Sequence, residues 1–363
     1  MNVDARAEAW ASLQLSGIAP RPLAELLRAF GSPEAVLAAS RAQRRAAVTE
    51  PAGTAMGAAP DRERLARTLA WLALPGASLV AWDDPDYPRA LLEIGDPPPV
   101  FYCLGRRDLA ARPALAIVGS RNATPQGCAD AAAFAAALSA AGLTVVSGLA
   151  LGIDAAAHRG AIEHAGSSIA VVGTGLDRVY PARNRDLAHA LAARGALISE
   201  FAPGVPPLPA NFPRRNRLIS GLARGVLVVE ATLSSGSLIT ARFAGEQGRE
   251  VFALPGSIHS PFSKGCHKLI REGAKLVETA QDILDELRLP QAAPAMAVAA
   301  HADDPEDRSI AAVLAALGHS PADVDTLASR CGFGAAAVMA ALTALELDGR
   351  VAAVPGGAWQ RIG

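Results

Sequence analysis

Hydrophobic residues between positions 114 and 277 occur in short continuous runs separated by longer amphipathic stretches. The runs are ALAIV, LTVV, SIAVV, ALIS, GVLVVE, EVFAL and KLV. Between them lie segments of helical length and periodicity, such as PQGCADAAAFAAALSAAG and SLITARFAGEQG. Continuous apolar strands joined by helices are typical of a parallel sheet covered on both faces. We therefore predict an α/β domain with a Rossmann-like, doubly wound parallel sheet over residues 81–289.

The two ends of the chain show a mainly helical pattern. Within residues 1–80, LAELLRAF and EAVLAAS flank Gly31-Ser32-Pro33, which supplies a turn and a serine N-cap. This part resembles a SAM-like or helix-hairpin-helix domain. Within residues 309–363, three helical stretches precede VAAV and AWQRI, and this order is typical of a winged helix.

Two segments lack a periodic face. Residues 290–308 are rich in proline, alanine and acidic residues, so we expect a flexible linker there. Residues 83–105 are rich in proline and are expected to form an extended connector.

The sequence leaves the roles of the two flanking domains open. Small helical domains of the N-terminal kind contact DNA backbones in some proteins and serve only for packing in others. The expected reading helix of the winged helix, residues 335–348, contains no arginine or lysine. Because a helix that reads duplex DNA needs polar or basic side chains on its exposed face, the sequence favours a protein-contact or packing role here.

Composition excludes several classes of protein. The chain has 363 residues, 51% of them hydrophobic and 19% charged, which is not the composition of a disordered protein. No charge-free apolar run reaches the ~18 residues of a membrane span, and the first residues do not resemble a signal peptide, so we expect a cytoplasmic protein. The four cysteines are far apart and form no CxxC pair, which predicts neither a metal site nor a disulfide framework.

Positive charge is concentrated in one part of the chain. The formal net charge is −1, but residues 203–275 contain ten basic and four acidic residues, a local balance of +6. A patch of this kind can bind a polyanion even when the whole surface does not.

Small residues follow the predicted strands, where open parallel sheets bind their ligands. The sequences at these places are Gly119-Ser120-Arg121, Ser147-Gly148, Gly173-Thr174-Gly175 and Pro255-Gly256-Ser257. Such residues let backbone amides approach an anion, and the following helix N-termini favour negative charge. Each glycine alone is also explained by ordinary turn formation, so the prediction of a phosphate site depends on their combination with arginine.

Two further motifs carry groups that suit a nucleic acid. Asn211-Phe212-Pro213-Arg214-Arg215-Asn216-Arg217 combines three arginines, an amide and an aromatic ring at the start of a predicted helix. Phosphate charge and base stacking are the two components of single-strand binding. Ser234-Ser235-Gly236-Ser237 opens another predicted helix and offers hydroxyls and amides. We expect Arg121 and the arginines at 214–217 to converge in one anion-binding cradle.

Motifs of the common nucleotide enzymes are absent from the sequence. There is no GxxxxGK[ST] loop, and Gly173-Thr174-Gly175 lacks the third glycine of a dinucleotide fingerprint, so we expect no cofactor. Asp154 and His158 are spaced to pair within one helix and tie down the loop before it. Glu200 and Glu230 end strands and are expected to orient arginines. Together these residues make no complete nuclease site, so we expect no enzyme.

Several long stretches of the chain carry a family resemblance. They are DYPRALLEIGDPPPVFYCLG, AIVGSRNATPQG, VVSGLALGIDAAAHRGAI, IAVVGTGLDRVYPARN, ISEFAPG, FPRRNRLISGLARGVLVVEATLSSGSLITARFAGEQGREVFALPGS and SKGCHKLIREGA. Together they resemble the DNA-processing family known as DprA/Smf. The resemblance implies a homodimer that binds single-stranded DNA and helps to load the RecA recombinase in natural transformation. It also implies that Gly119-Ser120-Arg121 binds phosphate, that Phe212 and residues 214–217 form a basic loop, and that Lys264 lies near the same pocket.

The sequence thus predicts a non-enzymatic protein that binds and protects single-stranded DNA without sequence preference. The expected binding residues are Gly119, Ser120, Arg121, Gly148, Gly173, Thr174, Phe212, Arg214, Arg215, Asn216, Arg217, Ser235, Gly236, Ser237 and Lys264. An alternative is a Rossmann-like enzyme acting on a nucleotide or ribosyl phosphate, which would use the same glycines and Arg121 for one phosphate. A third interpretation, a winged-helix transcription regulator, would depend on residues 309–363.

Overall fold

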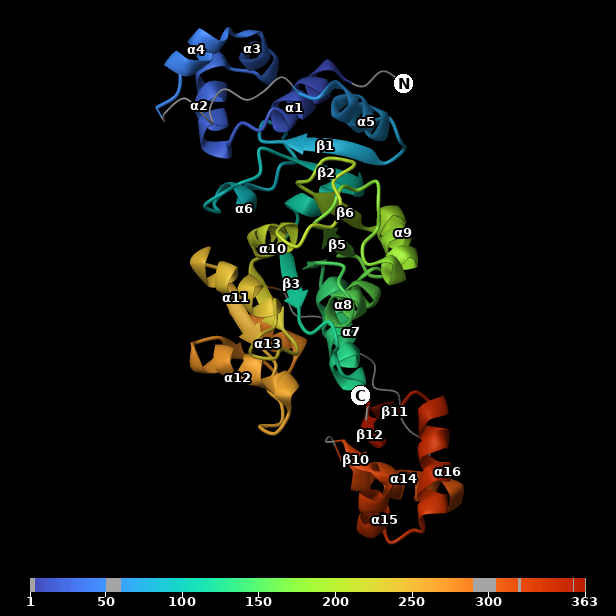
Figure 1. The fold of residues 1–363 in the computed structure, drawn as a ribbon. Coiled ribbons are helices and arrows are strands. Elements are labelled where there is room, and N and C mark those ends of the chain that lie inside the picture. The colour runs from blue at the N-terminus through green and yellow to red at the C-terminus, as the bar shows by residue number, and fades with distance from the viewer. Residues whose placement is uncertain (1–3, 50–59, 290–304, 319–320, 355, 363) are drawn as a thin grey trace.

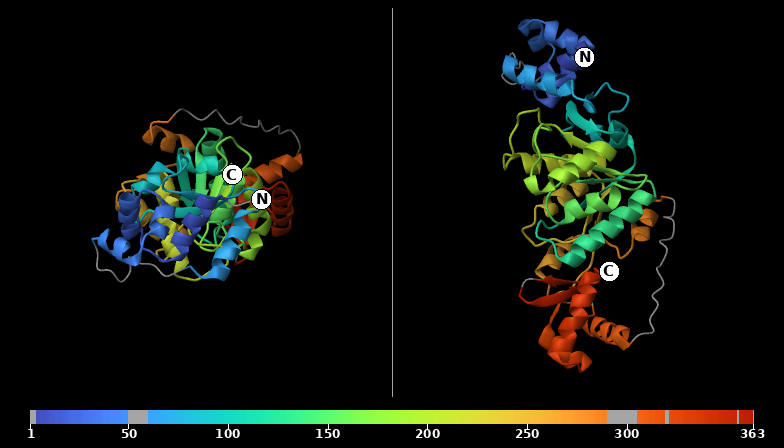
Figure 2. Two further views of the ribbon diagram at one scale, coloured as in Figure 1. Left: turned by 90° about the horizontal axis from the view of Figure 1, so that it is seen from above. Right: turned by 90° about the vertical axis from the view of Figure 1, so that its right-hand side faces the viewer.

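The structure, a computed structural model, describes residues 4–49, 60–289, 305–318, 321–354 and 356–362. Its centre is a sheet of nine strands in the order β1-β2-β6-β5-β4-β3-β7-β8-β9. The N-terminal helices lie at the β1 end of this sheet, and the C-terminal domain lies at the opposite end of the molecule (Figures 1 and 2).

Seven parallel strands form the main part of the sheet, and they coincide with the apolar runs of the sequence. They are β3 (Ala114–Val118), β4 (Thr144–Ser147), β5 (Ser168–Val171), β6 (Ala196–Ser199), β7 (Gly225–Val228), β8 (Glu250–Ala253) and β9 (Lys275–Leu276). The chain fills one side of β3 with β4, β5 and β6 and then returns to the other side with β7. The topological switch point therefore lies between β3 and β7, and the predicted doubly wound fold is confirmed.

Helices cover both faces of the parallel strands. One face carries α7 (Pro125–Ala140), α8 (Ile153–Ala161) and α13 (Ala280–Glu286), and the other carries α10 (Asn211–Leu222), α11 (Ser237–Glu246) and α12 (Lys264–Arg271). Side chains of β3 alternate between the two cores: Leu115 and Ile117 pack with α7, whereas Ala116 and Val118 pack with α10. Helix α9 (Arg185–Arg194) packs on β6, and the short 3-10 helices are η1 (Arg107–Ala111), η2 (Ala182–Asn184) and η3 (Pro261–Ser263).

The prediction that residues 83–105 form an extended connector is wrong for the second half of this stretch, which contains a strand of the sheet. Strand β2 (Val100–Gly105) pairs antiparallel with both β1 (Ala77–Ala81) and β6, and helix α6 (Arg89–Leu92) lies between β1 and β2. Proline cannot donate a ladder hydrogen bond, but Pro97 to Pro99 end just before the strand begins, so they do not prevent it. Strand β1 also crosses the expected domain boundary at residue 80. The other domain limits stay predictions.

The N-terminal domain consists of helices, and the predicted turn at Gly31-Ser32-Pro33 is present between two of them. They are α1 (Ala5–Leu15), α2 (Pro20–Phe30), α3 (Pro33–Ala38), α4 (Arg41–Ala46) and α5 (Arg62–Leu72). Gly31 ends α2 with a φ of 84°, and the Ser32 hydroxyl accepts a hydrogen bond of 3.2 Å from the Ala35 amide. Trp10 and Leu13 share one buried core with Tyr102 of β2, so this domain is packed on the end of the sheet.

The C-terminal domain is a winged helix, as expected. It consists of α14 (Pro305–Leu317), β10 (Ala322–Asp323), α15 (Val324–Cys331), α16 (Ala335–Leu347), β11 (Val351–Val354) and β12 (Ala358–Arg361). Of the expected linker, residues 290–304 lie outside the described residues and 305–308 begin α14. Within the described ranges, no single helix is long and apolar enough to cross a membrane. Only α15 and α16 together, bent by 106°, satisfy that test, and they do so by length and composition alone.

Candidate functional site

A pocket of about 380 Å³ lies at the switch point of the sheet. Its walls come from the loops after β3 and β7, the N-terminus of α11 and one face of α10. It is lined by Val118, Gly119, Ser120, Arg121, Asn122, Ala150, Asp154, Phe212, Arg215, Asn216, Ile219, Thr232, Ser235, Gly236, Ser237, Thr240 and Phe262. The loops that the sequence singled out as possible phosphate sites after β3 and β7 therefore meet in one place.

Helix α10 presents Phe212 to this pocket. The Asn211 amide at the start of the helix donates a hydrogen bond of 2.9 Å to the carbonyl oxygen of Gly173. The half-buried ring of Phe212 packs closely on Gly173, where a Cβ atom would lie 3.2 Å from the ring. Its other neighbour is the ring of Tyr180, whose centroid lies 5.6 Å away. Phe212 is thus held at the pocket wall with part of its ring exposed.

Arg215 is a structural element of the pocket wall. Its Nη1 donates a hydrogen bond of 2.7 Å to the carbonyl oxygen of Gly148 and another to that of Val171. Burial lowers the pKa of Arg215 to about 10, although the nearby charge of Asp154 acts in the opposite direction. Burial likewise raises the pKa of the Asp154 carboxyl, and the charge of Arg215 opposes that shift. The opposite charges of Arg215 and Asp154 thus offset part of the cost of burying each other.

The loop after β4 fits closely around these two side chains. Asp154 accepts hydrogen bonds from the amides of Gly148 at 3.0 Å and Ala150 at 3.3 Å. A Cβ atom on Gly148 would lie 2.2 Å from Nη1 of Arg215 and 2.7 Å from the Asp154 carboxylate. Gly148 is therefore needed because the side chains of Arg215 and Asp154 fill the space beside it, and not for contact with a ligand.

Arg121 is the free cation of the pocket. Its side chain is exposed, and it makes no hydrogen bond or ion pair with any other described residue. The rest of its loop is fixed: the Ser120 hydroxyl accepts a hydrogen bond of 3.2 Å from the Asn122 amide, and the Ser120 carbonyl accepts one from Ile153. A rigid loop thus presents an unpaired guanidinium, the group best suited to a phosphate.

The N-terminus of α11 lines the same pocket as Arg121. The hydroxyls of Ser235 and Ser237 are 2.7 Å apart, and both residues line the pocket together with Thr232 and Thr240. A Cβ atom on Gly236 would meet no atom within 4 Å, so the backbone there is open to a ligand. Hydroxyls and helix N-terminal amides complement the charge of Arg121 in binding an anion.

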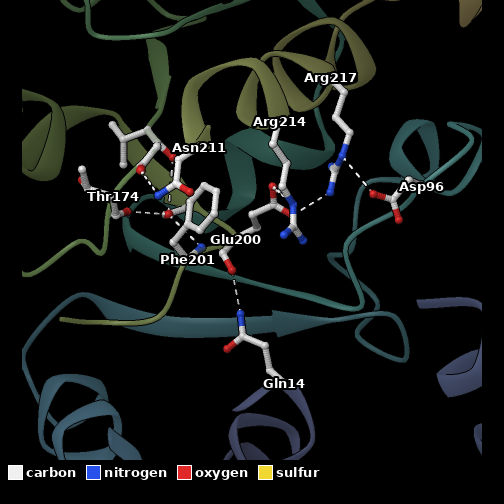
Figure 3. A network of polar contacts seen from close by, with 11 residues as sticks. Gln14, Asp96, Thr174, Glu200, Phe201, Asn211, Arg214 and Arg217 are labelled. Carbon is white, nitrogen blue, oxygen red and sulfur yellow. Dashed lines mark hydrogen bonds and ion pairs between the residues drawn. The ribbon is translucent and has the colours of Figure 1, made fainter. Parts of the chain in front are cut away.

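The expected single cradle of four arginines is wrong, because Arg214 and Arg217 lie at a second place (Figure 3). Both converge on Glu200, which follows β6: the Arg217 guanidinium donates a hydrogen bond of 2.6 Å and the Nε of Arg214 lies 3.2 Å from the carboxylate. Arg217 also contacts Asp96 at 3.3 Å. Arg214 keeps 57% of its side chain exposed and lies over the ring of Phe201, whereas Arg217 is buried.

Three other expected binding residues lie outside the pocket lining. Gly173 supports Phe212 from behind. Thr174 is buried, and its carbonyl oxygen accepts a hydrogen bond of 2.6 Å from Ser199. Lys264, at the start of α12, is exposed and donates to the carbonyl oxygen of Ile258.

The expected roles of the titratable groups need two corrections. Asp154 does tie down the loop before α8, but His158 does not pair with it: Nδ1 of His158 contacts the Ser168 hydroxyl at 2.7 Å. Glu200 orients two arginines, as expected, whereas Glu230 accepts hydrogen bonds from Thr124. Among the described residues, no three His, Cys, Asp or Glu side chains are grouped so as to hold a metal ion.

Several lining residues were missed by the sequence interpretation. Asn122 directly follows Gly119-Ser120-Arg121, and Thr232 lies between the run GVLVVE and Ser234-Ser235-Gly236-Ser237, so the rule that ligands bind after strand ends could have included both. Phe262 could not be found in this way. It belongs to η3 and reaches the pocket because its carbonyl oxygen accepts a hydrogen bond of 2.7 Å from Ala231, which follows β7.

Comparison with known proteins agrees with this fold along most of the chain. Residues 78–288 match the family model for DNA recombination-mediator protein A, and residues 294–357 match the DprA winged helix domain. The Smf protein of Escherichia coli is 45% identical over 304 residues, which are 82% of this chain and 80% of that protein.

Two solved structures are also similar. That of DNA processing protein A from Streptococcus pneumoniae is 37% identical with a TM-score of 0.67, covering 79% of this chain and 99% of the other. That of the Helicobacter pylori protein, which concerns its single-stranded DNA binding mode, is 30% identical with a TM-score of 0.54, covering 58% and 95%. The chain therefore belongs to the DNA recombination-mediator protein A family, whose members carry the names DprA and Smf.

Proposed function

We propose that this protein binds and protects single-stranded DNA without sequence preference and does not cut it. The observation that carries this proposal is the exposed, unpaired Arg121, which shares one pocket with the N-terminus of α11 and the ring of Phe212. A phosphate and an adjacent base could be bound there together. The Helicobacter pylori relative, described as binding single-stranded DNA, supports the same function.

The residues divide into those that contact the strand and those that position them. Arg121 neutralises one phosphate, the hydroxyls of Ser235 and Ser237 and the backbone at Gly236 bind its oxygens, and Phe212 stacks on a base. The half-exposed Arg214 is placed to take a second phosphate. Arg215, which is buried against backbone carbonyl oxygens, and Arg217, which is buried in its ion pair with Glu200, position α10. With two phosphates engaged, log affinity should fall against log salt with a slope of about −1.4, using ~0.7 per phosphate.

The alternative of an enzyme acting on a nucleotide has less support. The pocket is large enough for one nucleotide, since small-molecule pockets start at about 300 Å³. The carboxylate in the pocket lining, however, is that of Asp154. It already accepts hydrogen bonds from two backbone amides and is stabilised by the charge of Arg215. These contacts give Asp154 a structural role, and the described lining contains no second carboxylate and no histidine to act as a general base.

Fluorescence anisotropy with labelled oligo-dT of increasing length tests the proposal. We expect affinity to rise with length over the first several nucleotides, weak binding of duplex, and no cleavage product on a gel. Saturation by a mononucleotide, or turnover of one, would instead support the enzyme. A chain ending at Leu289 should still bind oligo-dT, whereas a winged-helix regulator would lose its DNA binding.

We further propose that the protein acts as a homodimer and delivers the bound strand to the RecA recombinase. Membership of a family of recombination mediators supports this part of the proposal. Light scattering should give twice the chain mass, and RecA assembly on protein-coated single strands should be faster with this protein than without it. A monomer, or an unchanged rate of RecA assembly, would contradict it.

A further inference from the structure

A carboxylate lies at the N-terminus of α7, the helix that follows the Gly119-Ser120-Arg121 loop. Glu230, just beyond β7, accepts hydrogen bonds from the Thr124 amide at 2.9 Å and from the Thr124 hydroxyl at 2.6 Å. Thr124 is itself the N-cap of α7, since its hydroxyl accepts a hydrogen bond of 3.0 Å from the Gly127 amide. The helix is therefore capped within its own sequence, and Glu230 adds a negative charge beyond that cap.

The fit around this carboxylate is close. A Cβ atom on Gly127 would lie between 2.4 and 2.7 Å from the carboxyl atoms of Glu230, so only glycine leaves room for them. The switch-point pocket opens on the N-terminus of α11, but no residue from Thr124 to Gly127 is part of its lining. The two helix N-termini beside the switch point thus differ: one is filled by a carboxylate and the other is open.

In a doubly wound fold, the N-terminus of the helix after the first strand is where a nucleotide phosphate binds. Here that strand is β3 and that helix is α7. A second anion there would be repelled by Glu230 and would find its space occupied.

We propose that Glu230 is a specificity-determining residue that acts as an internal anion. It fills the site at α7 where a mononucleotide phosphate would bind, and it leaves only the side of the pocket with Arg121 and α11 for a DNA strand. The inference rests on the proposed function, because it concerns the selectivity of that same switch point. It explains how a Rossmann-like sheet can bind a strand and discriminate against free nucleotides.

The test compares Glu230→Ala, which removes the charge and empties the space, with Asp130→Asn as a matched control. Asp130 lies on the same helix, where it accepts a hydrogen bond from Gln126, and its loss removes one negative charge without opening the N-terminus. Binding of inorganic phosphate and of adenosine monophosphate is measured by calorimetry and by the shift in melting temperature, with chloride at equal ionic strength as reference.

We expect Glu230→Ala to bind phosphate about tenfold more tightly than the wild type does, a change that corresponds to ~1.4 kcal/mol. Asp130→Asn should behave like the wild type. A folded Glu230→Ala variant with no gain, or a wild type that binds phosphate equally well, would overturn the inference.

A second variant covers the case in which Glu230→Ala does not fold. Glu230→Ser also leaves a space the size of a small anion, so formate or phosphate should raise its melting temperature and chloride should not. No anion response in this variant would also overturn the inference. Oligo-dT binding is measured in parallel: its absence in the wild type would contradict the proposed function alone, because the phosphate results do not depend on it.

Discussion

The carboxylate of Glu200 accepts a hydrogen bond of 2.6 Å from the Arg217 guanidinium, and the two side chains are only 4% and 9% exposed. Burial raises the pKa of Glu200, while the charges of Arg217 and Arg214 act against that shift. The backbone oxygen of Glu200 also accepts a hydrogen bond of 2.7 Å from Gln14 of α1 (Figure 3). Glu200, the first residue after β6, therefore holds α10 through its side chain and contacts the N-terminal domain through its backbone.

Replacing Glu200 by alanine should lower the free energy of unfolding by about 3 kcal/mol, because it leaves the buried Arg217 charge with only the exposed carboxylate of Asp96 as a partner. Urea denaturation measures this change. Glu163→Ala is the matched control: its ion pair with Arg194 is exposed, so its loss should cost less than about 1 kcal/mol. Equal effects of the two substitutions would show that the buried pair does not hold α10.

Arg121→Ala should weaken oligo-dT binding and flatten the salt dependence by about 0.7 in slope, the share of one phosphate. Anisotropy titrations between low and moderate salt give the slope. Arg112→Ala, at the opposite end of β3, should leave it unchanged. If both variants keep the wild-type slope, Arg121 does not contact phosphate.

Phe212→Ala should reduce oligo-dT affinity roughly 5- to 150-fold, since a stacked base is worth about 1 to 3 kcal/mol. The slope of affinity against salt should not change, because no charge is removed. Phe212→Tyr keeps an aromatic ring and should bind nearly as the wild type does. A large loss in the tyrosine variant would indicate that the ring is needed for packing on Gly173 and not for stacking.

Gly148→Ala should destabilise the protein by about 1 to 3 kcal/mol, the usual cost of forcing an atom into a filled space. The clash is with Arg215 and Asp154, so strand binding should fall as well. Gly245→Ala is the control, because a Cβ atom in this position of α11 meets nothing within 4 Å. It should be neutral or stabilising, as alanine favours a helix. Thermal unfolding of both variants checks this.

His158 should make the protein less stable in acid. Burial lowers its pKa to about 3, so the folded state keeps the imidazole neutral while the unfolded chain takes up a proton below its ordinary pKa of 6.5. The stability contribution is therefore complete above pH 6.5 and is lost as the pH falls toward 3, by up to ~1.4 kcal/mol per pH unit.

Urea unfolding of the wild type and of His158→Asn at pH 7.5, 6 and 5 measures this dependence. The wild type should lose more stability on acidification than the variant does. Parallel pH profiles would mean that His158 is not the group responsible.

The division of the arginines could not be predicted from their closeness in sequence, but the helix explains it. Successive residues of a helix are turned by about 100°, so Arg214 and Arg217 share one face of α10 and both reach Glu200. Phe212, Arg215 and Ile219 share another face and line the pocket. The prediction of a helix that starts within residues 211–217 was correct, and applying its periodicity to the arginines would have separated them.

Strands β3 to β8 were predictable because each is a buried apolar run bounded by turn residues. Strand β2 was not, because its partners β1 and β6 are set by long-range pairing that leaves no local signal beyond a short apolar run after prolines. The unpaired state of Arg121 was equally hidden, since it depends on the three-dimensional contacts that hold Asp154, the carboxylate of the same pocket, to the amides of Gly148 and Ala150.

Backbone hydrogen bonds run without interruption from β1, beside the N-terminal helices, to β3 and β7 at the pocket. In the proposed function, a force on a strand bound at Arg121 is shared by several hydrogen-bonded strands. The sheet is thus one continuous frame that carries both the proposed DNA site and the N-terminal helices.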